Sequence, residues 1–304
     1  MIPTVAARFR QMPGGLGYMI GAAFFFSLMS LQVKVVGQRL PSAEVVFVRN
    51  LFSLIVTWQM LRRQGVAPWG RRKGLLLLRG LAGFLALLCL FYALPRLPLA
   101  DATVLHFTNP VFTGLLAAIV LGESLSRRDV GGTLLSLVGV VLVARPSFLF
   151  GASTDSLPLV PVAATLAGAL LSAVAYTTVR KLAATEHALV IVFYFPLVSV
   201  PAAVPLMWGT ALWPTPTEWL LLLGIGVCTQ IAQVLLTMGL QRERAGRALS
   251  MSYVQIVFAA LWGLLFFGEV PDLLAIGGAV LIVGGTLLVA RSGTPTQTAS
   301  PART

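Results

Sequence analysis

Residues 100–145 read ADATVLHFTNPVFTGLLAAIVLGESLSRRDVGGTLLSLVGVVLVAR, and residues 246–291 read GRALSMSYVQIVFAALWGLLFFGEVPDLLAIGGAVLIVGGTLLVAR. The two stretches align without a gap at an offset of 146, and 14 of the 46 aligned positions are identical. Only three of the identities are leucines, so shared hydrophobicity does not explain the match. Self-similarity at a fixed offset indicates a fold assembled from repeated units.

The composition indicates that lipid surrounds most of the chain. Of its 304 residues, 57% are hydrophobic and 11% are charged, and the mean hydropathy is +0.89. Soluble domains devote roughly a quarter of their residues to charge. Because about 20 residues of helix cross a bilayer core and lipid satisfies no backbone polar group, the recurring apolar runs predict an all-α membrane protein.

Ten apolar runs are long enough to span. Arg8 and Arg10 precede the first run as in a signal peptide, but that run is long enough to cross the membrane and is predicted to be retained. The polar tail at 292–304 is predicted to be disordered. The predicted transmembrane helices cover residues 16–36, 43–61, 75–94, 99–121, 129–145, 159–180, 188–208, 218–239, 246–267 and 272–290.

The internal match pairs spans four and five with spans nine and ten. A weaker match at an offset of 147 pairs the first span with the sixth, for example Gly21 with Gly168. Residues 16–145 and 159–291 are therefore predicted to be two five-helix repeats. Since five is odd, the second repeat enters the membrane upside down. This is the inverted-repeat plan of many secondary transporters, which bind substrate in a central cavity between the repeats.

The net charge of +12 is unevenly distributed. Sixteen of the 22 Lys and Arg residues lie in the two tails and the even-numbered loops, three lie in the odd-numbered loops, and Lys34, Arg49 and Arg79 lie inside spans. The positive-inside rule therefore predicts that both termini are cytoplasmic, in the inner (plasma) membrane of a bacterial-type cell. The basic residues form no continuous patch, so nucleic acid is not an expected partner.

Functions other than transport lack their usual signals. Cys89 and Cys228 lie inside apolar runs and have no disulfide or metal spacing, so they are expected to be packing residues, and no metal or cofactor is expected. A membrane-embedded enzyme would need clustered Asp or His ligands, or a nucleophile with a base. A channel would need a charged ring or a filter sequence, and a non-transporting receptor is the remaining alternative.

Polar residues at helical spacing mark candidate cavity-lining faces. Span four carries His106 and Asn109 on one face, and span nine carries Gln255 at the position of Asn109, next to Tyr253. The same polar stripe thus recurs in both repeats, and Pro110, Pro196 and Pro201 can kink their helices. The alternative is hydrogen bonding between helices, worth about 0.6 to 2 kcal/mol per contact. Other spans contribute the candidate substrate-binding residues Tyr176, Gln230 and Gln233.

Arg49, Arg79 and Lys34 are charged residues inside spans and are the sharper functional clue, although Lys34, near the outer end of span one, is expected to snorkel or to form a structural pair. A charge at the bilayer centre costs several kcal/mol, so Arg49 and Arg79 are hypothesised to meet an anionic group of the substrate, such as a carboxylate. Snorkelling or a structural ion pair is the alternative. His106 is the only span histidine, and it could carry a proton because its unperturbed pKa is about 6.5, which keeps protons as a candidate coupling ion. A structural hydrogen bond is the other interpretation.

Each repeat also contains a Gly-Glu pair where a span ends. Gly122 and Glu123 close span four, and Gly268 and Glu269 close span nine. Inversion of the second repeat would place the two glutamates at opposite faces of the membrane, away from its middle. Glycine is common just beyond helix ends, so a helix-end role for the glutamates is favoured over ion binding.

Together these features resemble the EamA family of the drug/metabolite transporter superfamily. The resemblance is carried by VRNLFSL around Arg49, by the run from Phe91 to Val143, and by FFGEVPDLLAIGGAVLIVGG in the second copy. It implies a ten-helix bundle that exports or exchanges small metabolites, such as amino acids or organic anions, by alternating access. The family's arginine in span two falls on Arg49, and Phe195 takes its place in the second copy. A monomer or weak homodimer in the lipid bilayer is expected.

Overall fold

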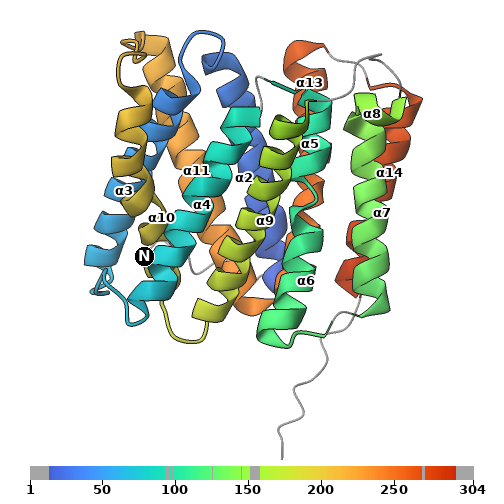
Figure 1. Ribbon diagram of the computed structural model, residues 1–304, viewed down its shortest axis with the longest axis horizontal. Coiled ribbons are helices and arrows are strands. Elements are labelled where there is room, and N and C mark those ends of the chain that lie inside the picture. Colours follow the sequence, from blue (N-terminus) through green and yellow to red (C-terminus); the bar gives the residue numbers. More distant parts are fainter. Residues whose placement is uncertain are drawn as a thin grey trace, which may run out of the picture.

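The computed structural model describes most of the chain as helix (Figure 1). Arg8, Arg10 and Glu269 lie outside the described residues, as does the tail predicted to be disordered at 292–304. The described residues are 14–93, 96–97, 99–124, 126–144, 146–150, 158–268 and 271–291.

Ten helical spans follow one another in these ranges. Nine of the described spans are long and apolar enough to cross a membrane. The remaining span is α7, which has 18 residues and begins with three charged side chains, and it packs closely against α14. The first repeat contains α2 (Gly14–Val36), α3 (Ser42–Arg63), α4 (Lys73–Ala93), α5 (Leu99–His106), α6 (Asn109–Leu121) and α7 (Arg127–Ala144). The short α8 (Ser147–Phe150) is followed by α9 (Leu159–Leu182), α10 (Ala188–Met207), α11 (Pro216–Arg242), α12 (Ala245–Ser250), the 3₁₀ turn η1 (Met251–Tyr253), α13 (Val254–Phe267) and α14 (Leu273–Arg291).

The packing of the helices follows a two-fold pattern that relates the repeats. α2 packs against α11 in the way that α9 packs against α4, and α7 pairs with α14. Gly21 of α2 faces Leu235 of α11, and its counterpart Gly168 of α9 faces Cys89 of α4. Cys89 and Leu235 are themselves 146 residues apart. The repeat therefore extends in space to spans that the sequence match does not cover, and the predicted fold class of two five-helix repeats is confirmed.

The α7–α14 pair is built on glycines in both helices. A Cβ at Gly278 would lie 2.6 Å from the carbonyl oxygen of Gly139, and one at Gly132 would lie equally close to the carbonyl oxygen of Gly285. These four positions are related by the offset of 146. Small residues let helix backbones approach closely in lipid, where van der Waals packing is a main driving force for association.

Spans four and nine are both interrupted at matching places. Span four breaks between α5 and α6 at Pro110, whereas α10 (Ala188–Met207) continues as one helix through Pro196 and Pro201. Pro110 has no N–H for the carbonyl of His106, and the side-chain Nδ2 of Asn109 donates to that oxygen at 3.0 Å instead. Span nine passes through η1, which contains the counterpart of Phe107. The prediction of one continuous helix over 246–267 is wrong there, because no proline signals the break.

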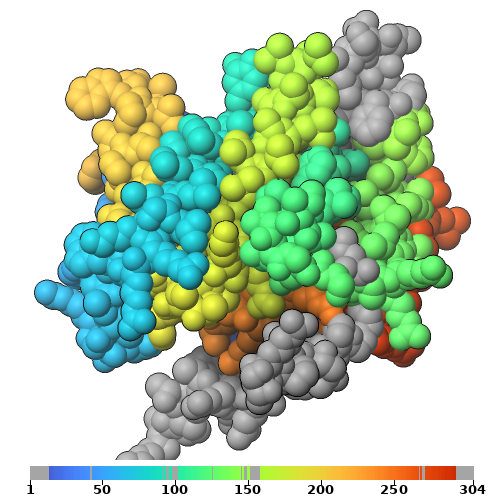
Figure 2. Space-filling view, turned by 60° about the horizontal axis from the view of Figure 1, so that its bottom comes forward, coloured from blue at the N-terminus to red at the C-terminus, as the bar shows by residue number. Residues whose placement is uncertain are grey.

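The two ends of the bundle differ in charge. The α3–α4, α6–α7 and α9–α10 connections lie at one end, called here the basic end (Figure 1). With this end turned forward, α4, α9 and the α6–α7 region lie side by side across it (Figure 2). At the opposite end, Arg39 forms an ion pair with Glu218, and Glu44 accepts a hydrogen bond from the backbone N–H of Leu212. The hydrogen bond to Glu218 raises the pKa of Arg39.

Candidate functional site

A buried hydrogen-bonded group joins α3 to α11 in the interior of the bundle. Ser53 donates its hydroxyl to the Oε1 of Gln230, and the Nε2 of Gln230 donates to the Thr57 hydroxyl at 2.8 Å. All three side chains are buried. Ser53 and Thr57 were not identified from the sequence, although they lie on one face of span two at the helical spacing of i and i+4.

Arg79 on α4 contacts α11 one turn beyond Gln230, at Gln233, and lies among residues from three other helices. Its side chain is 3% exposed, and its Nη2 lies 3.4 Å from the Oε1 of Gln233. The Cζ atom lies 5.1 Å from the ring centre of Phe195 on α10, and Tyr176 on α9 is a further neighbour. Three predicted site residues, Arg79, Tyr176 and Gln233, therefore lie in one group.

Arg49 lies apart from that group, near α2. Its Nη1 is 3.5 Å from the Met29 sulfur, which is a weak acceptor, and its buried Nε has no hydrogen-bond partner. The neighbouring Asn50 is 1% exposed, and both atoms of its side-chain amide lack partners. Asn50 is a further candidate that was not identified from the sequence. Ser53 lies one turn away on the same helix.

The predicted stripe of spans four and nine forms a second group around the helix breaks. The Nδ1 of His106 is buried without a partner, as is the hydroxyl of Tyr253. The ring centre of Tyr253 lies 6.0 Å from that of Phe107. The side-chain amide of Asn109 donates a hydrogen bond to the backbone carbonyl of His106. Gln255 is half-buried in the first turn of α13. These contacts run along spans four and nine and do not reach Arg79.

Cysteine labelling would test whether water reaches the helix break. In a background without Cys89 and Cys228, His106→Cys is expected to react with a membrane-impermeant maleimide in at least one conformation of the transport cycle, because a buried polar atom without a partner is stabilised when water or substrate reaches it. Ala117→Cys is the matched control, since Ala117 is fully buried on the same span and should stay protected. Equal protection at both positions, with and without candidate substrates, would remove His106 from the site.

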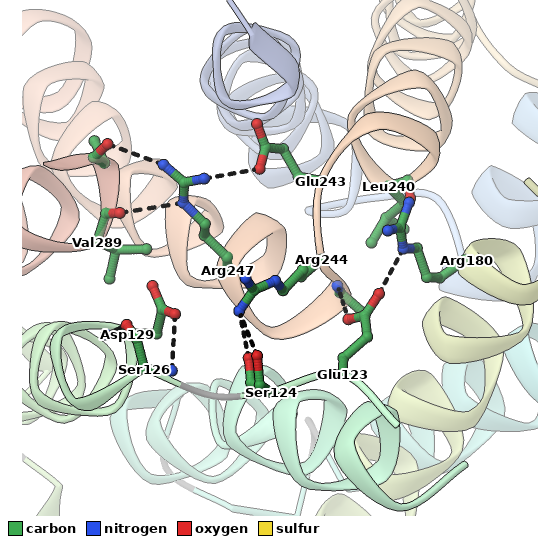
Figure 3. A network of polar contacts seen from close by, with 12 residues as sticks. Glu123, Ser124, Ser126, Asp129, Arg180, Leu240, Glu243, Arg244, Arg247 and Val289 are labelled. Carbon is green, nitrogen blue, oxygen red and sulfur yellow. Dashed lines mark hydrogen bonds and ion pairs between the residues drawn. The ribbon is translucent and has the colours of Figure 1, made fainter. Parts of the chain in front are cut away.

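A third polar group joins the two repeats at the basic end (Figure 3). Gly122 ends α6 with a φ of 66°, and Glu123 follows it. The Glu123 carboxylate accepts a hydrogen bond from the Nε of Arg180 at 2.6 Å and one from the backbone N–H of Ala245 at 2.8 Å. Arg180 also donates to the carbonyl of Gln241 at 3.0 Å. The helix-end role predicted for Glu123 is confirmed.

Arg247 completes the polar contacts at this end. Its Nη1 lies 3.1 Å from the Oε2 of Glu243, and its Nε donates to the carbonyl of Val289 at the end of α14. Arg244 donates to the carbonyl of Ser124. Most of the charged side chains in Figure 3 are thus paired with acids or with helix-end carbonyls, unlike Arg49 and Arg79. Among the described residues, no three His, Cys, Asp or Glu side chains are placed to hold a metal ion.

Buried polar groups between two inverted repeats of apolar helices define a membrane transporter of the inverted-repeat class. The chain belongs to the EamA-like transporter family, which it matches over residues 13–145 and 160–291. It is a multi-pass membrane protein and a secondary transporter of small molecules.

Several known proteins are similar to this chain over nearly its whole length. The pseudopaline exporter CntI of Pseudomonas aeruginosa is 39% identical over 272 residues, which cover 89% of this chain and 94% of the relative. Human solute carrier family 35 member G1 is 33% identical, and the match covers 90% of this chain and 78% of the relative. The S-adenosylmethionine uptake transporter of Rickettsia bellii is 28% identical, over 90% of this chain and 92% of the relative. A crystal structure of a protein that is 21% identical has a TM-score of 0.78 over 90% of this chain and 95% of the other chain. This likeness supports the fold alone.

Proposed function

We propose that this chain exports or exchanges a small metabolite that carries an anionic group, and that Arg79 binds this group. The observation that carries the proposal is a buried guanidinium, 3% exposed, whose contacts are an amide oxygen and an aromatic ring, with Tyr176 nearby. No described carboxylate lies within ion-pair distance of it. Since a buried charge without a counterion is costly, an anionic substrate would provide the counterion for Arg79.

The neighbouring polar groups support a substrate site of mixed chemistry. Gln233 and Tyr176 offer hydrogen bonds beside Arg79, and Gln230 extends the polar surface towards α3. Arg49 is proposed to contribute a second cation. The recurrent stripe of His106, Asn109, Tyr253 and Gln255 is proposed to line the path at the helix breaks, with His106 as a candidate proton carrier. A central cavity that connects these groups remains a prediction.

The proposal also covers the direction of transport and the orientation of the protein in the membrane. The basic end is proposed to face the cytoplasm of a bacterial-type inner membrane, because basic loops are retained on that side. Transport out of the cell is favoured by the likeness to an exporter at 39% identity, whereas the uptake transporter is 28% identical. The repeats are proposed to extend over 16–145 and 159–291, and the chain to work as a monomer or weak homodimer.

Transport in proteoliposomes tests the proposal. A thermal-shift screen of the purified chain against metabolites would select ligands, whose counterflow is then measured with and without a pH gradient. Arg79→Gln is expected to lower transport of an anionic ligand about ten-fold or more, because a hydrogen bond to a charged group is worth about 1.5–3 kcal/mol. Arg63→Gln, an exposed arginine at the end of α3, is the control and should transport normally. Ligands that bind but are never translocated by wild-type protein would refute the proposed function.

A further inference from the structure

The two buried arginines occupy related halves of the bundle. Arg49 on α3 aligns with Phe195 on α10 at the offset of 146, and Met29 on α2 aligns with Tyr176 on α9 at 147. The packing supports these alignments. Gly80 of α4 faces Val198 of α10, and the residues 146 positions away, Gly226 of α11 and Phe52 of α3, face each other in the same manner. The half made by α2, α3 and α11 is therefore equivalent to the half made by α9, α10 and α4.

Each half holds one guanidinium, but on a different helix. In one half Arg49 lies beside Met29. In the other half Phe195 and Tyr176 occupy the equivalent places, and Arg79 from α4 lies over the Phe195 ring. The position on α11 that corresponds to Arg79 is Ile225, which is fully buried. The sequences of the repeats are asymmetric here, but each half of the bundle contains one buried arginine.

The two charges lie at different depths. Arg49 is the eighth residue of α3, which starts at the end opposite the basic end, and Arg79 is the seventh residue of α4, which starts at the basic end. At about 1.5 Å per residue, the backbone of each arginine lies roughly 10 Å from its own end of the bundle, and a bilayer core is about 30 Å thick. The two arginines are therefore attached to the backbone on either side of the midplane. Ser53, Gln230 and Gln233 form a polar path between them.

Both charges are uncompensated at the same time. The Nε atoms of Arg49 and Arg79 are buried without partners, and the described residues place no carboxylate against either guanidinium. An anion at one arginine would leave the other charge buried and unpaired, which is strongly unfavourable. A ligand with a single anionic group therefore matches only half of the site.

We propose that the substrate carries two anionic groups, such as two carboxylates on a short chain, and that it bridges Arg49 and Arg79. This proposal rests on the proposed function in that the same site carries the substrate. The carboxylates accept hydrogen bonds from the two guanidinium groups. The polar path of Ser53, Gln230 and Gln233 meets the middle of the substrate, so the spacing of the two anionic groups sets specificity.

Binding to the purified full-length chain tests the bridge with defined probes. The probes are the linear dicarboxylates from succinate to suberate, each compared with its own monoamide, which has the same length and one charge fewer. At least one dicarboxylate is expected to bind wild-type protein ten-fold or more tightly than its monoamide by calorimetry. In Arg49→Gln and in Arg79→Gln this preference is expected to disappear, whereas Arg63→Gln should retain it.

Melting temperatures without ligand separate a binding role from a structural one. Because each glutamine variant removes an unpaired buried charge, both are expected to melt at or above the wild-type temperature. A lower melting temperature, equal binding of dicarboxylates and monoamides, or no binding by the whole series would overturn the bridge. A dicarboxylate that binds with the expected preference but is not translocated would leave the bridge standing and refute transport, so the two proposals fail separately.

Discussion

The Gly278→Ala substitution is expected to lower the free energy of unfolding by about 2–3 kcal/mol, because the new methyl group would meet a neighbouring backbone. Its Cβ would lie 2.6 Å from the carbonyl oxygen of Gly139 and 2.8 Å from a methyl carbon of Val143. Backbone atoms cannot rotate away as a side chain can, so α7 and α14 would have to separate. Thermal unfolding of the detergent-solubilised protein, with the yield of folded protein, measures the loss.

The adjacent glycine provides a matched control. A Cβ at Gly277 meets nothing within 4 Å, so Gly277→Ala adds the same methyl group to open space. This variant should be as stable as wild type or slightly more stable, because alanine favours helix over glycine. Equal losses at positions 277 and 278 would contradict the close contact of α7 and α14. Gly132→Ala tests the equivalent contact and should resemble Gly278→Ala.

Removal of Glu123 has the second large expected effect. Glu123→Ala leaves Arg180 without its ion pair and the N–H of Ala245 without its acceptor, and both side chains of the pair are largely buried, at 12% and 26% exposure. The expected loss in the free energy of unfolding is about 2–3 kcal/mol, since an unpaired buried group keeps its full desolvation cost. Chemical or thermal unfolding would measure it. Glu123→Gln should lose less, because its amide oxygen can still accept the hydrogen bond from Ala245.

A double-mutant cycle distinguishes the ion pair from a local effect on α6. If the carboxylate acts mainly through Arg180, then adding Arg180→Ala to Glu123→Ala should cost little more than the first change alone. Strictly additive losses would show that the two side chains do not act together. Arg39→Gln at the opposite end is the comparison, because its side chain is 45% exposed and water screens such pairs, so a small change is expected there.

The helices of this protein are largely predictable because the signal for each one is local. A run of about 20 apolar residues is sufficient to identify a span, and α2, α9 and α10 begin and end within a few residues of the predictions. The break in span four is also local, since Pro110 causes it. The break at η1 is not local. It lies at the same aligned position without a proline, so its cause is in the packing around it.

The candidate site is only partly predictable for a related reason. Arg49 and Arg79 stand out because charged residues are rare inside spans. Asn50, Ser53 and Thr57 are ordinary residues for a membrane helix, and only the position of Gln230 on α11 shows which of them are engaged. Sequence spacing places His106 and Asn109 on one face, and only the structure shows that the Asn109 amide donates a hydrogen bond to the backbone carbonyl of His106.

The sequence by itself determined the number of spans, the two repeats, the uneven distribution of charge and the presence of two buried arginines, because each depends on residues close together in the chain or on a direct match between its halves. Only the tertiary structure decided which residues meet. The contact of Arg79 with Phe195, the different depths of the two arginines and the joining of Glu123 to Arg180 all arise where helices far apart in sequence pack together. Such contacts depend on how side chains from several helices fill a shared space, and no single stretch of sequence records that arrangement.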